Sequence, residues 1–202
     1  MVKQIIVGLI SVFGALAVSG LSASASTELQ QVDSAALGTR PRPPWSEPVQ
    51  INDPFEGDFI GVFDRHLFFD RLFNASVRVE VQSLWSPEEI RVLLTTRDRD
   101  CLGRSFRRGI ASSLDCSEFN NARNLIGLFI RINDDVFRIN GQNGTFPVSG
   151  ELAQALRNAL EENISIRLVT ESGETIDSEI GEGTVEAWKM VYDTPLANLI
   201  DE

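Results

Sequence analysis

Alternating apolar and polar residues recur along much of the chain, in short runs separated by turn residues. Residues 77–85 alternate apolar and polar side chains, and residues 90–96 are rich in β-branched side chains, as is typical of half-buried strands. The segment between them has two interpretations: Pro87 closes a hairpin turn, or Ser86 and Glu89 form the capping box of a helix. We favour the hairpin, because the apolar residues that follow do not keep helical spacing.

The same pattern predicts further hairpins in the second half of the chain. Residues 125–132 and 136–139 flank an Asn-Asp-Asp turn, and residues 164–170 and 175–180 flank Glu-Ser-Gly-Glu. Two Asn-Gly pairs in residues 140–144 predict tight turns, and the Thr-Phe-Pro-Val that follows them predicts a short edge strand.

Helical spacing is clearest after Ser149, which is well placed as an N-cap. The apolar stripe of this helix, at i, i+3, i+4, i+7 and i+8, consists of Leu152, Ala155, Leu156, Ala159 and Leu160. A final short helix is predicted between Thr184 and Pro195. Its stripe consists of Val185, Trp188 and Val191.

Residues 55–73 hold six of the twelve phenylalanines of the chain. Phe59, Phe63 and Leu67 recur near helical spacing, so we expect a helix packed on the core. The alternative is an exposed aromatic surface that binds a partner or a membrane interface. Core packing is favoured, because a buried aromatic stripe is the commoner arrangement.

The grouping of strands, helix, strands and helix with short connections predicts an α+β fold. We expect an antiparallel sheet built from hairpins, with two or three packed helices, as a single domain over residues 55–202. Residues 26–54 hold five of the eight prolines and little apolar periodicity, which predicts a disordered Pro-rich linker. Residues 40–45 have the spacing of a polyproline II ligand, although a spacer is the plainer interpretation.

The first 25 residues have the organisation of a signal peptide. A short segment that carries Lys3 precedes an apolar run from Ile5 to Leu21, and Ala23, Ser24 and Ala25 then form a cleavage site. We therefore expect a secreted or periplasmic protein with no stable membrane insertion after cleavage. A retained N-terminal anchor is the alternative.

The charge balance narrows the classes of partner. The formal net charge of −11 argues against nucleic acid and anionic membranes as main partners. Only Lys3 and Lys189 are lysines, so sixteen of the eighteen basic residues are arginines. Arginine prefers fixed, bidentate anionic partners.

The only two cysteines, Cys101 and Cys116, are predicted to form a disulfide in an oxidising compartment. Closing a loop of this size stabilises by about 3 kcal/mol in the chain-entropy model. Arg104, Arg107 and Arg108 lie between the cysteines. Either this loop folds back on the acidic C-terminal quarter or stays solvated, or it binds an acidic protein, a carboxylate-bearing polysaccharide or a second copy.

Few residues support catalysis. His66 is the only histidine, with Asp64 and Asp70 nearby, and the chain has no G-x-S-x-G motif. Residues 98–109 begin like an EF-hand loop but end on glycine, where calcium needs a bidentate glutamate. We predict no metal and no cofactor, and an exported, non-enzymatic binding or accessory module of the cell envelope. The alternative is a secreted hydrolase that uses paired carboxylates, with or without His66.

Overall fold

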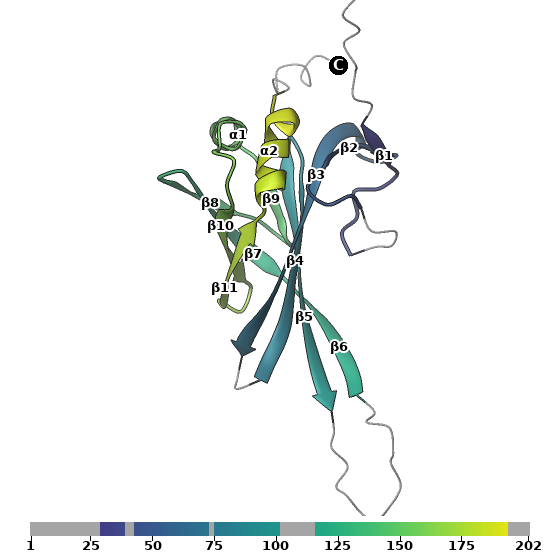
Figure 1. Cartoon of the computed structure of the whole chain (residues 1–202), viewed down its shortest axis with the longest axis vertical. Helices are drawn as coiled ribbons and strands as arrows, with labels where there is room; N and C mark the ends of the chain where they lie inside the picture. The colour runs from purple at the N-terminus through teal and green to yellow at the C-terminus, as the bar shows by residue number, and fades with distance from the viewer. Residues whose placement is uncertain (1–28, 39–42, 73–74, 102–115, 194–202) are drawn as a thin grey trace, which may run out of the picture.

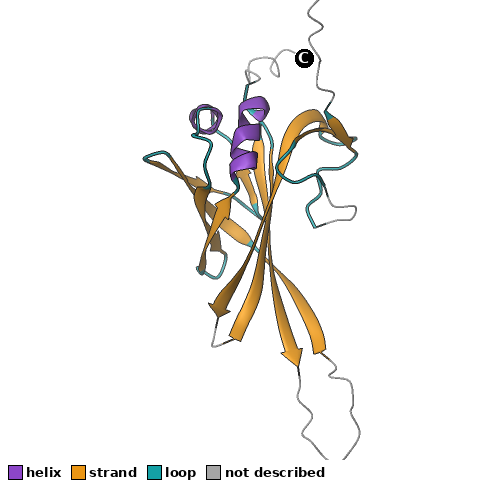
Figure 2. Cartoon of the chain, in the orientation of Figure 1, coloured by secondary structure: helices purple, strands orange, loops and turns teal. Residues whose placement is uncertain are grey.

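Most of the described chain is β-sheet, arranged as two sheets with two helices (Figure 2). The computed structural model describes residues 29–38, 43–72, 75–101 and 116–193. The predicted signal peptide lies outside these ranges, as does the first half of the polyproline-like motif.

The larger sheet has the strand order β1-β2-β3-β4-β5-β6, and β9 also pairs with β5. Its strands are β1 (Gln30–Val32), β2 (Pro48–Asp53), β3 (Gly57–Leu72), β4 (Ala75–Trp85), β5 (Glu89–Cys101), β6 (Cys116–Arg123) and β9 (Thr145–Pro147). All pairs are antiparallel except β1 with β2. Strands β3 to β6 extend past the smaller sheet as a long ribbon (Figure 1).

The smaller sheet has the strand order β11-β10-β7-β8 and is antiparallel throughout. Its strands are β7 (Leu125–Ile132), β8 (Asp135–Asn140), β10 (Ile164–Thr170) and β11 (Thr175–Ile180). The helices, α1 (Gly150–Arg157) and α2 (Glu182–Val191), lie at the end of the molecule away from the ribbon (Figure 1). The fold is thus β-rich with two helices, and the predicted hairpins β4–β5, β7–β8 and β10–β11 are confirmed.

Most of the predicted turns have the expected backbone, whereas the tight turn predicted at Asn140 and Gly141 is wrong, because neither residue has a positive φ and Asn140 ends β8. The Ser86 N–H donates to the Glu89 carbonyl at 3.1 Å, which closes the β4–β5 hairpin and rules out a helix there. Asn133 turns the chain between β7 and β8 with φ 53°. Asn143 and Gly144 have φ values of 52° and 78°, as a tight Asn-Gly turn requires.

The helix expected in the phenylalanine-rich segment is wrong, because these residues form β3. Phe59, Phe63 and Leu67 are four positions apart, a spacing that keeps residues on one side of a helix and also on one face of a strand. Val62 is buried in the main core, whereas its neighbour Phe63 is buried on the opposite face in a separate cluster with Val49 and Ile51. The apolar residues therefore contribute to both faces of the larger sheet.

The disordered linker expected for residues 26–54 is also wrong for the parts that form β1 and β2. Val49 and Ile51 are fully buried on the outer face of the larger sheet, against Phe63. Trp45 contacts Phe63 edge-on, with ring centroids 6.4 Å apart, and the Arg65 guanidinium lies 5.8 Å from the Trp45 ring. The prolines of this segment thus accompany a second small core, and the domain begins before residue 55.

The main core lies between the inner faces of the two sheets and under the helices. Its largest fully buried side chains include Trp85 from β4 and Trp188 from α2, whose ring centroids are 4.5 Å apart. Leu152 and Leu156 of the predicted α1 stripe are buried, whereas Leu160 lies beyond the helix and is exposed. Large apolar side chains from both sheets and both helices therefore share one core.

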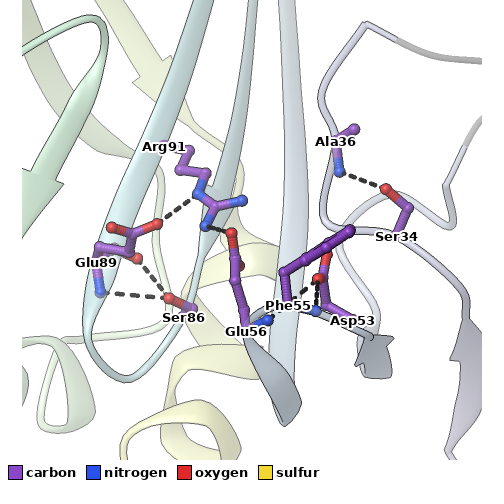
Figure 3. Close-up of polar contacts among 8 residues, drawn as sticks. All are labelled: Ser34, Ala36, Asp53, Phe55, Glu56, Ser86, Glu89 and Arg91. Atoms are coloured by element: carbon purple, nitrogen blue, oxygen red, sulfur yellow. Dashed lines mark hydrogen bonds and ion pairs between the residues drawn. The ribbon is translucent and has the colours of Figure 1, made fainter.

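The β2–β3 connection is fixed by polar contacts (Figure 3). Asp53 Oδ1 accepts hydrogen bonds from the N–H groups of Phe55, at 2.9 Å, and Glu56, at 3.2 Å. Arg91 on β5 pairs with Glu56 at 2.5 Å and also with Glu89. The turn holds the Phe55 side chain in solvent, where it is 96% exposed.

Candidate functional site

The residues proposed from the sequence as a binding loop, Arg104, Arg107 and Arg108, lie outside the described part of the chain. Cys101 ends β5 and Cys116 begins β6, and the two are direct partners in the antiparallel register. Directly opposite residues of an antiparallel pair have Cα atoms roughly 4.5–5.5 Å apart, within the range of about 4.4–6.8 Å that disulfides span. This register brings the two backbones to the separation that a disulfide needs, and the disulfide itself stays a prediction.

The outer face of the smaller sheet carries an open groove of about 700 Å³. Side chains alternate along each strand, so Leu128 and Ile130 of β7 enter the core. Phe129 and Arg131, between and after them, face outward into the groove.

The strand registers arrange the groove residues in two rows across the sheet. The first row runs from β8 to β11 as Arg138, Phe129, Arg167 and Asp177. The second row, one pleat along, is Val136, Arg131, Ser165 and Glu179. We call these eight residues the arginine groove; His66 and Phe68 of β3 line its end beyond β11.

The three arginines of the groove differ in their partners. Arg167 makes two hydrogen bonds to Asp177, at 2.5 and 2.8 Å, and this contact lowers the pKa of the Asp177 carboxyl. The Arg138 guanidinium lies 5.4 Å from the Phe129 ring centroid. Neither Arg138 nor Arg131 forms an ion pair with any residue that the structure describes. The groove therefore offers two positive groups without a carboxylate partner.

A second hollow of about 370 Å³ adjoins the groove at the β7–β8 turn. Arg131 and Ser165 line both cavities. The other residues of this second hollow are nearly all polar: Asn133, Asp134, Glu162, Asn163 and Ile164. We call it the polar hollow. It presents amide, carboxylate and hydroxyl groups beside the guanidinium of Arg131.

His66, the candidate base of the hydrolase hypothesis, lies at the junction between β3 and the edge of β11. Its Nδ1 accepts a hydrogen bond from the Glu179 N–H at 3.2 Å and lies 2.9 Å from Ser178 Oγ. A backbone N–H can only donate, so in the neutral ring the proton is on Nε2. Among the residues whose side chains are described, no carboxylate hydrogen-bonds to this ring. The Asp70 side chain lies outside that set. The observed role of His66 is to join the two sheets.

Asp64, the second hydrolase candidate, is buried beneath the N-terminus of α2. Its Oδ1 accepts hydrogen bonds from the Thr184 hydroxyl at 2.6 Å and from the Gly181 N–H at 3.3 Å. Burial raises the pKa of Asp64 above its usual value, although both hydrogen bonds oppose the shift. The carboxyl thus anchors α2 to β3 and is shielded from a substrate.

Changing Asp64 to asparagine should alter the pH dependence of stability. Between the usual and the raised pKa, the folded protein binds more protons than the unfolded chain, so the free energy of unfolding falls as pH rises. Asp64→Asn removes this loss, so its stability relative to wild type, measured by urea unfolding, should increase as pH rises from about 4, the usual aspartate pKa, through the raised pKa of Asp64.

Asp177→Asn is the matched control with the opposite sign. Because Arg167 lowers the pKa of Asp177, that carboxylate stabilises the fold above its unfolded pKa, and this contribution is lost as pH falls through the folded pKa. The stability of Asp177→Asn relative to wild type should therefore decrease as pH rises. Parallel pH profiles for wild type and Asp64→Asn would contradict the assignment for Asp64.

Other kinds of site are not seen in the described ranges. Nowhere in them do three or more histidine, cysteine, aspartate or glutamate side chains gather as a metal site would require. Within the same residues, both helices are too short or too polar to cross a membrane. Comparisons with protein-family models, curated proteins and solved structures found no match.

The arginines of the groove were missed in the sequence, although each occupies a polar position inside an alternating strand. Arg131, Arg138 and Arg167 all lie between apolar residues that face the core. Three neighbouring strands with an arginine on the outward face would have been a usable signal. Recognising it requires the strand registers, because the order β10-β7-β8 is not the order of the sequence.

Proposed function

We propose that this chain is an exported, non-enzymatic binding module of the cell envelope and that the arginine groove binds an anionic ligand. Export is supported by the signal-peptide pattern of the first 25 residues. Binding is supported by one observation above all: Arg131 and Arg138 lie in a groove where no carboxylate of the described residues pairs with them, in a chain of net charge −11. Guanidinium groups bind carboxylate or phosphate through paired, charge-assisted hydrogen bonds.

The groove is also held in place before any ligand arrives. Its side chains project from four paired strands, Phe129 lies beneath the Arg138 guanidinium, and Asp177 fixes Arg167. Rigid elements and supporting contacts reduce the ordering cost of binding. The competing hydrolase hypothesis has less support, since the contacts of His66 and Asp64 join structural elements.

Replacing both Arg131 and Arg138 with alanine should weaken anion binding by roughly tenfold to a hundredfold, because a hydrogen bond to a charged group contributes about 1.5–3 kcal/mol. Calorimetric titration with hyaluronan, polygalacturonate and polyphosphate measures the loss. Arg157→Ala is the control, since Arg157 pairs with Asp193 and lines neither cavity.

The outcomes separate the groove from the cysteine-flanked loop. Urea unfolding of the variants must first show that they remain folded. Loss of binding only in a variant that lacks Arg104, Arg107 and Arg108 would move the site to that loop. Absence of binding to all three polyanions, or equal binding by the double variant, would contradict the proposed function.

A further inference from the structure

The arginine groove and the polar hollow together point to one class of ligand. We infer that they form a single elongated site for an acidic oligosaccharide in which charged and neutral sugars alternate, with a carboxylate bound by Arg131. This inference rests on the proposed function and narrows it to a kind of ligand.

The first support is that the groove and the polar hollow share two lining residues. Arg131 and Ser165 contribute to both. They are neighbours in the second row of the groove, on the adjacent strands β7 and β10. A ligand that occupies both cavities must therefore pass the Arg131 guanidinium, which makes Arg131 the central anion-binding group of the site.

The second support is that the two cavities differ in charge. The groove holds Arg131, Arg138 and Arg167 against the carboxylates of Asp177 and Glu179, whereas the polar hollow holds Arg131 against the carboxylates of Asp134 and Glu162. Asp134 and Glu162 form no ion pair with any described residue. They would repel a second anionic group placed in the hollow. A ligand that fits both parts carries an anion at Arg131 and neutral polar groups next to it.

The third support is the kind of polar group present. Asn133 and Ser165 supply an amide and a hydroxyl, which can both donate to and accept from sugar hydroxyls. Asn163 Oδ1 accepts from the Glu182 N–H at 3.0 Å, so this side chain contributes mainly its NH₂ donor. Phe68 and Val136 add apolar surface to the groove, against which the C–H faces of sugar rings can pack. A concave, mixed surface of this size is typical of sites for small or linear ligands.

These features disfavour the other anionic ligands. Polyphosphate carries charge at every unit, and a fully carboxylated polysaccharide does the same, so both would place anions against Asp134 and Glu162. The acidic face of a protein or of a second copy would also meet Asp177 and Glu179 at the far side of the groove. An alternating acidic glycan avoids the repulsion in the hollow.

Calorimetric titration of the full chain can test this with hyaluronan hexasaccharide, which alternates glucuronate and N-acetylglucosamine. The comparison ligands are its carboxyl methyl ester, an oligogalacturonate of similar length, polyphosphate and free glucuronate. We expect the hexasaccharide to bind at least tenfold more tightly than the ester or oligogalacturonate, and Arg131→Ala to lose at least tenfold in affinity for it.

Two variants separate the hollow from the groove. Asn133→Gly removes the amide but keeps a backbone that tolerates φ 53°, and Ser165→Ala removes the hydroxyl. Together they should weaken hexasaccharide binding by about fivefold to tenfold. Binding of free glucuronate, which is too short to fill the hollow, should stay unchanged. Arg157→Ala again serves as the control.

The results distinguish this inference from the proposed function. In one outcome, oligogalacturonate or polyphosphate binds as tightly as the hexasaccharide or more tightly, and the binding still depends on Arg131 and Arg138. That result would contradict an alternating glycan as the ligand but would agree with anion binding in the arginine groove. The same holds if the hollow variants bind the hexasaccharide as wild type does. Absence of binding to every anion would overturn both.

Discussion

Replacing Trp188 with alanine is expected to lower the free energy of unfolding by about 3–5 kcal/mol. Trp188 is fully buried, and its ring lies 4.5 Å from that of Trp85. Alanine would leave a cavity where α2 packs on the larger sheet, and the rigid strands around it can close that space only in part. Urea unfolding followed by circular dichroism measures the change.

Tyr192→Phe is the matched control at the C-terminal end of the same helix. Tyr192 is also buried, and its hydroxyl has no hydrogen-bond partner in the part of the chain that is described. Removing an unsatisfied buried hydroxyl should leave stability unchanged or raise it slightly. A loss for Trp188→Ala no greater than that of Tyr192→Phe would show that α2 is not part of the main core.

Replacing Ile51 with alanine should cost about 2–5 kcal/mol, although its segment has the composition of a linker. Ile51 is fully buried in the second core, where it contacts the larger sheet beside Val49 and Phe63. A disordered linker would tolerate the substitution without measurable effect. Urea unfolding therefore decides whether β2 belongs to the folded domain.

Phe55→Ala, four residues away, is the control for this second prediction. Phe55 is 96% exposed, so its removal should change stability by no more than about 0.5 kcal/mol. Similar small effects for Ile51→Ala and Phe55→Ala would contradict the burial of β2 in the second core. A large loss for Ile51→Ala alone would support it.

The hairpins and helices could be predicted from the sequence because their apolar residues follow one period each. Val77, Val79 and Val81 alternate along β4 over a single buried face, and Leu152 and Leu156 mark the buried side of α1. Local spacing was sufficient in these segments, because their apolar residues lie mainly on the face that contacts the main core.

Strands β2 and β3 were not predicted, for a reason that lies outside the segments themselves. β3 has apolar residues on both faces because a second core covers its outer face, and that core is supplied by Val49 and Ile51. The proline-rich composition around β2 is typical of a linker, so β2 is not recognised as a strand. Because β2 helps to bury the outer face of β3, β3 has apolar residues on both faces and does not alternate. Only their long-range pairing resolves both.

The candidate site depended even more on register. The positions of Arg131, Arg138 and Arg167 on outward faces could be read from alternation, but their neighbours could not, because β10 pairs with β7 and not with the strand before it. The pairing of Arg167 with Asp177, and the absence of such a partner for Arg131, follow from that arrangement. The sequence therefore indicated that arginine binds the ligand, but it did not indicate that the proposed binding surface is the outer face of the smaller sheet.

The contacts of β3 with the smaller sheet also limit how that sheet can grow. At the β11 side, His66 accepts from the Glu179 N–H and Asp64 accepts from the Gly181 N–H, so side chains occupy donors that a further strand would need. At the other side, β8 ends the sheet without a neighbouring strand among the described residues. A strand added at β11 would have to displace the His66 side chain from the Glu179 N–H, whereas no such contact covers the β8 edge among the described residues. The β8 edge is therefore the side of this sheet that a further strand could reach without breaking a contact of the fold.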